Sequence, residues 1–329
     1  MNVSDSHRRR YLIIANKTGQ LGNRLVIYAH MLAAGFERDW TVLNPSFCEY
    51  AHFFTGTSGR LLTCGDEQVN TPIIPLLERQ VLYRMNRVGY QASKILARIP
   101  YSGVGWAKVS NSLHYDLTTL VDRAEQRHWR AVFTQNYHFR QHEWCARHGE
   151  RIRALLMPME PWRTQAENTV RAARQIGELG EIGESRKNGK SGKPGEQGSS
   201  NVILVGVHIR HGDYLHHLAG KFFYDVSTYA NLMRQVQSFL APQRVVFLVC
   251  SNAHHQPDDF LGLNVTFGPG HLVSDLHALS LCDYLFGPPS SFSAWAAYHG
   301  KVRYHMVENI DDPLTAAHFA VPASPDPRY

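Results

Sequence analysis

Residues 201–214 read NVILVGVHIRHGDY, and this stretch decides the fold class of the chain. The run Val202–Val207 is apolar and rich in β-branched residues, a pattern typical of a strand buried on both faces of a parallel sheet. Alternate residues of a strand share a face, so His208 and Arg210 are predicted to project together while Ile209 points into the core. The polar residues therefore gather where the buried strand ends.

Arg210 is the first candidate functional residue. Open α/β sheets bind ligands at the carboxyl ends of their strands, which is where Arg210 is predicted to lie. A guanidinium group stays charged and can bind a phosphate through two parallel hydrogen bonds. A purely structural alternative is an ion pair between Arg210 and Asp213 that fastens the following turn. The residues alone leave both interpretations open.

Three blocks resemble the fucosyltransferase superfamily, which contains the α1,2-, α1,6- and protein O-fucosyltransferases. The segment HIRHGDY (residues 208–214) is similar to the His-x-Arg-Arg-x-Asp motif of that superfamily. Two further blocks are similar to segments of that superfamily: KTGQLGNRL (17–25) and DLHALSLCDYLFGPPSSFSAWAAYHG (275–300). The three blocks follow one another along this chain in the same order as in the superfamily. The Gly-Asn and Ser-Ser-Phe-Ser-x-Trp pieces are nearest to the α1,2-fucosyltransferases of glycosyltransferase family 11.

The resemblance implies roles for residues in the blocks 17–25 and 208–214. Arg210 matches the arginine that stabilises the negative charge growing on the β-phosphate of the donor. His208 matches a histidine that contacts the nucleotide. Asp213 matches the motif aspartate, which we expect to orient Arg210 or to assist the acceptor. Gly22 and Asn23 match a loop that closes over the phosphates and the acceptor.

The block 275–300 implies the remaining residues of the donor site. Asp275 matches an aspartate that accepts hydrogen bonds from the guanine ring. Ser291 matches a phosphate-binding serine, and we place Ser290 and Phe292 beside it in the same turn. Amides at a helix N-terminus also favour a phosphate. A plain N-cap is the structural alternative for this turn, and a capping turn can bind an anion as well.

The sequence departs from the family pattern at three positions. His211 stands where a second arginine is usual, so an imidazole replaces one cation. Arg24 replaces the customary glutamine, and Ala294 replaces an aromatic residue. We expect these changes to bear on the acceptor, on the donor sugar or on activity itself.

Composition limits the classes of function. The 329 residues are 43% hydrophobic and 19% charged, with a net charge of +6 and five cysteines. These values indicate a globular protein, and scattered cysteines without a Cys-x-x-Cys pair argue for a reducing compartment and against a structural zinc site. The chain has no Asp-x-Asp motif, so we predict a metal-independent enzyme with no cofactor beyond its donor substrate. No nucleic-acid motif is present, and nucleic acid is not an expected partner.

Strands alternate with helices along the chain, which predicts an α/β fold with parallel sheets. Residues 177–200 are rich in Gly, Ser, Lys and Glu and are predicted to form a flexible linker. They would separate an acceptor-side domain (1–176) from a nucleotide-sugar-binding Rossmann-type domain (201–329). The resemblance implies the GT-B architecture, in which two Rossmann-type domains face a cleft. A helical stretch over residues 72–99 carries spaced basic residues, interpreted as a solvated face.

The expected function is an inverting, metal-independent transfer of fucose from GDP-fucose to a glycan hydroxyl, with an α1,2 linkage to a galactoside. Alternatives are another nucleotide sugar on the same fold, or a carbohydrate- or nucleotide-binding homologue without turnover. A lipid-linked glycan and a polysaccharide are both candidate acceptors. Neither a signal peptide nor a run of about 20 apolar residues is present. We therefore expect a bacterial, cytoplasmic protein, with peripheral contact at the inner membrane face as an option.

Overall fold

The computed structural model describes residues 9–58, 76–109, 114–136, 138–187 and 202–326. Inter-residue contacts divide the chain into two compact units. Unit 1 contains residues 1–159 and 323–329, and unit 2 contains residues 160–322. Both units carry parallel sheets with helices, so the predicted α/β class with parallel sheets is confirmed.

Unit 1 contains a four-stranded parallel sheet in the order β2-β1-β5-β3. Its strands are β1 (Tyr11–Ile14), β2 (Thr41–Leu43), β3 (Val104–Lys108) and β5 (Ala131–Gln135). Two short strands, β4 (Tyr115–Asp116) and β6 (Phe139–Arg140), pair separately. The helices are α1 (Leu21–Arg38), α2 (Leu76–Leu96), α3 (Leu117–Gln126), α4 (His142–Arg147) and α5 (Gly149–Leu155), with 3₁₀ turns η1 (Pro45–Phe47) and η2 (Ala51–Phe53).

Unit 2 contains a five-stranded parallel sheet in the order β11-β10-β7-β8-β9. Its strands are β7 (Val202–Ile209), β8 (Arg244–Ser251), β9 (Val265–Phe267), β10 (Tyr284–Gly287) and β11 (Arg303–Met306). Its helices are α6 (Trp162–Lys187), α7 (Val226–Leu240), α8 (Leu272–Ser280) and α9 (Ser291–Gly300). The 3₁₀ turns are η3 (Gly212–Leu215), η4 (His217–Gly220), η5 (Pro257–Phe260) and η6 (Ala316–His318).

The strand order of unit 2 creates a topological switch point beside β7. Strands β8 and β9 extend the sheet on one side of β7, whereas β10 and β11 extend it on the other. The strand Val202–Ile209 is buried along most of its length, as its apolar sequence predicts. Doubly wound sheets bind ligands outside the carboxyl ends of the two strands that flank such a point. In this unit, those strands are β7 and β10.

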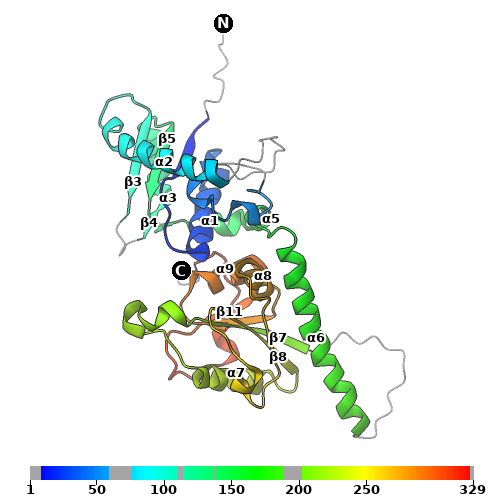
Figure 1. The fold of residues 1–329 in the computed structure, drawn as a ribbon. Coiled ribbons are helices and arrows are strands. Elements are labelled where there is room, and N and C mark those ends of the chain that lie inside the picture. Colours follow the sequence, from blue (N-terminus) through cyan, green and yellow to red (C-terminus); the bar gives the residue numbers. More distant parts are fainter. Residues whose placement is uncertain (1–8, 59–75, 110–113, 137, 188–201, 327–329) are drawn as a thin grey trace. The chain divides into compact units, whose positions relative to one another are not determined.

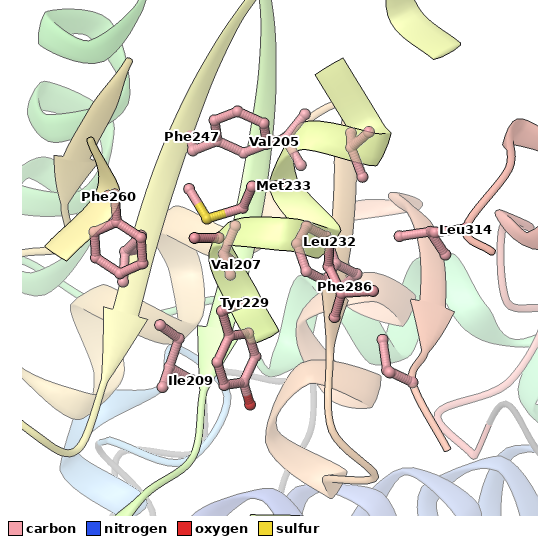
Figure 2. Close-up of a cluster of buried hydrophobic side chains, with 14 of the residues drawn as sticks. Val205, Val207, Ile209, Tyr229, Leu232, Met233, Phe247, Phe260, Phe286 and Leu314 are labelled. Carbon is pink, nitrogen blue, oxygen red and sulfur yellow. The ribbon is translucent and has the colours of Figure 1, made fainter. Parts of the chain in front are cut away.

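A hydrophobic cluster fixes β7 in place (Figure 2). Val207 and Ile209 of β7 lie in the same cluster as Tyr229 and Met233 of α7 and Phe247 of β8, and all five side chains are buried. Large side chains interdigitated at this density leave β7 little freedom to shift. The residues that follow Ile209 therefore begin from a rigid strand end.

The boundary between the units differs from the predicted one. Residues 177–187, predicted as linker, continue helix α6, while residues 188–200 lie outside the described part of the chain. Helix α6 belongs to unit 2 because it packs on that unit's sheet. A Cβ atom on Gly177 would lie 2.6 Å from the Val202 side chain, and Arg174 forms two hydrogen bonds with Asp283, of 3.0 and 3.1 Å. The composition of residues 177–187 indicated a polar segment, but it contained no information on the contact of that segment with the sheet.

The end of the chain also departs from the predicted division. Residues 323–326 return to unit 1, where Asp326 accepts a hydrogen bond from Nε of Arg140 at 3.1 Å and Ser324 lies 2.7 Å from Nδ1 of His142. These are contacts between residues more than 180 positions apart, so no local pattern reports them. Among the helices of the described ranges, none has the length and apolar character that crossing a bilayer requires.

Candidate functional site

The predicted donor residues of unit 2 gather at the carboxyl edge of its sheet. His208 is the penultimate residue of β7, and Arg210 follows the strand directly. The turn that contains Ser290 follows β10, the neighbour of β7 at the switch point. A Cβ atom on Gly287, at the end of β10, would lie 2.6 Å from the carbonyl oxygen of His208. The glycine therefore lets the two strand ends approach closely.

Arg210 is held by its neighbours with its guanidinium group still partly accessible. Its Nη2 donates to Oδ2 of Asp213 at 2.9 Å, and the guanidinium carbon lies 5.5 Å from the centre of the Tyr214 ring. The side chain of Arg210 is 16% exposed, against 52% for Asp213. Asp213 also lies 3.5 Å from Nδ2 of Asn252. This geometry fits both an aspartate that orients Arg210 and the structural ion pair considered above.

His208 is a neutral group in this setting. Burial, with the charge of Arg210 nearby, lowers the pKa of His208 to about 3. Its ring packs against the Phe292 ring with a centroid distance of 5.1 Å. His208 therefore contributes no positive charge for a diphosphate, and it forms part of the wall that joins β7 to α9.

The turn before α9 has the geometry of an anion site. Ser290 caps the helix by accepting from the main-chain amide of Phe292 at 3.2 Å, and Ser291 is the first residue of the ten-residue helix. The hydroxyl of Tyr214 donates to the carbonyl oxygen of Pro289 at 2.6 Å. This bond fastens the turn to the segment that carries Arg210. The positive end of the α9 dipole and the remaining amides can bind a phosphate at this place.

Asp275 lies at the same edge, further along the sheet. His208 of β7 pairs in register with Cys250 of β8, and the Cys250 thiol donates to the carbonyl oxygen of Asp275 at 3.9 Å. The Asp275 carboxylate accepts from the amide of Gly270 at 2.9 Å through Oδ1. Burial raises the pKa of Asp275 to about 6, although the Gly270 hydrogen bond opposes the shift. The carboxylate is thus buried with one oxygen bound by the protein.

If Asp275 accepts the guanine ring, as the family resemblance implies, its raised pKa predicts a pH-dependent affinity for GDP. Guanine offers two N–H donors, which only the ionised carboxylate accepts well. Above pH 6 the carboxylate is ionised, so affinity is expected to be full near pH 7.5 and to fall as the pH drops through about 6. Calorimetric titration of GDP at pH 5 and pH 7.5 measures this. Asp275→Asn should bind GDP weakly with a flat pH profile, and an equally steep profile in the variant would contradict the assignment.

Gly22 and Asn23 lie in unit 1, in the first turn of α1. Helix α1 begins at Leu21, so Gly22 and Asn23 are helical residues and not part of a loop as the resemblance implied. Gly19 ends the preceding turn with φ +61°, and a Cβ atom there would lie 2.1 Å from Nδ2 of Asn23. The β1–α1 turn is therefore built against the Asn23 side chain.

Arg24, one of the departures from the family pattern, stabilises this turn. Its Nε donates to the carbonyl oxygen of Gly19 at 3.2 Å, and its Nη1 lies 2.8 Å from Oε2 of Glu49. The side chain also stacks over the Tyr50 ring at 4.9 Å. Arg24 is 8% exposed. Its contacts are structural, and they hold the turn that contains Gly19.

His211, a second departure, has its ring engaged within unit 2. Nε2 of His211 lies 2.8 Å from the carbonyl oxygen of Tyr224, and the ring packs on Phe223 with a centroid distance of 4.7 Å. Ala294, the third departure, is buried in α9. The imidazole of His211 therefore helps to pack the segment that follows Arg210.

Sequence reasoning missed Asn252 and the role of Tyr214. The Asn252 side chain accepts from the amide of His211 at 2.8 Å and donates to its carbonyl oxygen at 3.2 Å, which fixes the segment around Arg210. A signal was present, because Asn252 closely follows the apolar run Val245–Cys250, which is typical of a buried strand that ends at the same sheet edge. Within the described ranges, no group of three or more His, Cys, Asp or Glu side chains is arranged to hold a metal ion. Metal independence stays a prediction of the sequence.

Comparisons with known proteins bear on the whole chain. The family model "Glycosyl transferase family 11" matches residues 130–315, more than half of the 329 residues. The structure of an Arabidopsis thaliana FUT1 mutant in complex with GDP aligns with a TM-score of 0.55 at 11% identity, covering 97% of this chain and 75% of that chain. The fucosyltransferase NodZ from Bradyrhizobium aligns with a TM-score of 0.49 at 14% identity, covering 92% and 96%. No curated protein sequence matches. The likeness to the Arabidopsis structure shows the predicted GT-B-like fold.

Proposed function

Because the chain belongs to glycosyltransferase family 11, we propose that it transfers fucose from GDP-fucose to a glycan hydroxyl, with inversion and without a metal ion. The observation that carries this proposal is the switch-point edge of unit 2. There, Arg210 and the N-terminus of α9 lie next to one another, with the buried carboxylate of Asp275 at the same edge. An anion site and a guanine acceptor on one edge match the two ends of a guanosine diphosphate.

The reaction asks little covalent chemistry of the protein. The acceptor oxygen attacks C1 of fucose, and the bond from C1 to the β-phosphate oxygen breaks with its electron pair leaving on GDP. Arg210 and the α9 amides stabilise the charge that grows on the leaving phosphate. The acceptor proton must pass to a base. Asp213 is our candidate for orienting Arg210 or assisting the acceptor, and its exposed carboxylate is available for either role.

The acceptor in this proposal is a β-galactoside, fucosylated at O2. Support for it comes from the Gly22–Asn23 and Ser290–Ser291–Phe292 blocks, which resemble the α1,2-fucosyltransferases. The structure contributes the β1–α1 turn, in which Gly19 packs against the Asn23 side chain. Product analysis by NMR after incubation with GDP-fucose and lactose would identify the linkage. Fucose at any other position would contradict the α1,2 assignment.

Donor selectivity tests the proposal directly. GDP, UDP and ADP are titrated into the protein by calorimetry in the presence of EDTA. We expect GDP to bind at least about tenfold more tightly than UDP, because only guanine offers paired N–H donors to Asp275. Asp258→Asn, which changes an exposed carboxylate in η5, is the matched control for Asp275→Asn and should bind GDP as the wild type does. Preference for UDP would favour another nucleotide sugar, and GDP binding without turnover would favour the non-catalytic homologue.

A further inference from the structure

The inward face of α2 in unit 1 carries hydrogen-bonding side chains. Nδ2 of Asn86 donates to the carbonyl oxygen of Ile14 in β1 at 3.4 Å, and the Tyr83 hydroxyl accepts from the amide of Lys17 at 3.2 Å. Tyr90, one turn after Asn86, is buried on this face. In Figure 1, α2 lies across the strands of unit 1. Its polar side is therefore the side turned toward the protein.

The outward face of α2 is apolar, the reverse of an ordinary surface helix. Apolar side chains recur at spacings of three, four and seven residues along one stripe, which Ile99 extends into the turn after the helix. Each is 50–70% exposed: Val81, Met85, Val88, Ile95 and Ile99. We call these five residues the α2 stripe. A contiguous exposed apolar stripe of this kind marks a surface that another structure covers.

Basic residues accompany the α2 stripe, which identifies the kind of structure that covers it. Arg84, Arg87, Lys94 and Arg98 lie on the same helix and the turn after it, and the sequence from Val81 to Ile99 contains no Asp or Glu. A second copy of the chain would bring like charges together. An anionic lipid surface complements both the apolar stripe and its basic flank.

A basic cavity continues this surface at the C-terminal end of α2. Its volume is 360 Å³, and it lies around the edge strand β3. Among the described residues, four cationic and three aromatic side chains line it, with two alanines and no carboxylate: Arg98, Lys108, Arg123, Arg127, Trp106, Tyr115, Trp129, Ala97 and Ala107. Arg123 and Arg127 stack over the Trp129 ring at 5.6 and 5.9 Å. Such a lining suits a phosphate group that meets the protein beside the α2 stripe.

We propose that the α2 stripe and the basic cavity together dock unit 1 on an anionic membrane surface. The stripe enters the interface between lipid headgroups and acyl chains, and the cavity holds a lipid phosphate. Under this proposal, the basic residues of the stretch 72–99 face lipid headgroups, whereas the sequence alone suggested a solvated face. The inference is independent of the donor chemistry, because every residue that carries it lies in unit 1.

Vesicle sedimentation tests the proposal with the full chain. The wild type is expected to bind vesicles of phosphatidylcholine with phosphatidylglycerol, to bind pure phosphatidylcholine weakly, and to be released at about 1 M salt. Val88→Asp should weaken partitioning at least about tenfold. Leu261→Asp, an equally exposed apolar residue of unit 2, is the matched control and should sediment as the wild type does. The double variant Arg87→Glu/Lys94→Glu should lose the preference for anionic vesicles without changing any apolar residue.

Two further arms separate the sources of binding. Soluble glycerol phosphate should compete poorly, because it lacks the acyl interface that the α2 stripe enters. Strong competition would assign the cavity to a free phosphate ligand and overturn membrane docking. Failure of the wild type to bind anionic vesicles, or equal binding by Val88→Asp, would also overturn it. So would light scattering that shows a dimer which Val88→Asp dissociates. Circular dichroism verifies that each variant is folded, and the charge-reversed pair decides the case if Val88→Asp is not.

Discussion

Arg210→Ala is expected to lower kcat/KM for transfer from GDP-fucose by about 10²–10³-fold, equivalent to about 2.7–4 kcal/mol of transition-state stabilisation. Arg210 directly follows strand β7 at the switch point, where Asp213 and Tyr214 hold its guanidinium group. Burial lowers the pKa of His208 to about 3, so this neighbour cannot supply the missing charge. Initial rates of fucosylated product, measured over a range of donor concentrations, give the ratio.

The partition of the effect between kcat and KM is informative. A group that acts on the leaving phosphate should lower kcat, whereas a group that only binds the donor should raise KM. Arg210→Lys keeps the charge but loses the two-bond geometry, so we expect an intermediate rate. Arg234→Ala, which removes an exposed arginine of α7, is the control. Wild-type kinetics in Arg210→Ala would show that the Arg210–Asp213 pair only fastens a turn.

Asp326→Ala is expected to lower the free energy of unfolding of unit 1 by about 3–5 kcal/mol. The ion pair of Arg140 and Asp326 is buried, with both side chains 5% exposed and an Nε–Oδ2 distance of 3.1 Å. Removing the carboxylate leaves the Arg140 charge buried without this partner, and that desolvation is the source of the cost. Hydrogen exchange followed by mass spectrometry can measure the change in peptides of β1 and β5, separately from unit 2.

Asp122→Ala provides the matched comparison, since Asp122 also pairs with an arginine of unit 1. Its bond to Nη2 of Arg38 is 2.7 Å, but the carboxylate is 46% exposed. Solvent screens such a pair, so the expected cost is below about 1 kcal/mol. Equal effects of the two substitutions would show that the return of residues 323–326 to unit 1 contributes little to its stability.

Much of unit 2 was predictable from local sequence. The apolar run of residues 202–207 identified a buried strand, and the change to polar residues after it located the end of that strand, where Arg210 is the candidate functional residue. The resemblance to the fucosyltransferase superfamily, and not the local pattern, singled out Asp275, Ser290 and Ser291 as further donor residues. The carboxyl ends of parallel strands meet at one side of a sheet, so the position of Arg210 needs no contact information. The structure places these residues there.

Other features depended on contacts between distant residues. The neutral state of His208 follows from its burial, and the binding of α6 to the sheet of unit 2 follows from Gly177 and from the Arg174–Asp283 pair. The composition of residues 177–200 described a polar segment without saying what its first turns touch. The boundary between the units therefore moved to residue 160.

Helix α2 shows most clearly the difference between what the sequence determines and what depends on tertiary contacts. Its sequence determined a helix with an apolar stripe, a basic flank and no acidic residue between Val81 and Ile99. Periodicity states which residues share a face, but it does not state which face the protein covers. Only the tertiary structure decided that Asn86 and Tyr83 turn inward to hydrogen-bond with the β1 segment while Val88 faces outward. The physical reason is that hydrogen bonds from main-chain groups distant in sequence select the buried face, and a local sequence pattern contains no information on those partners.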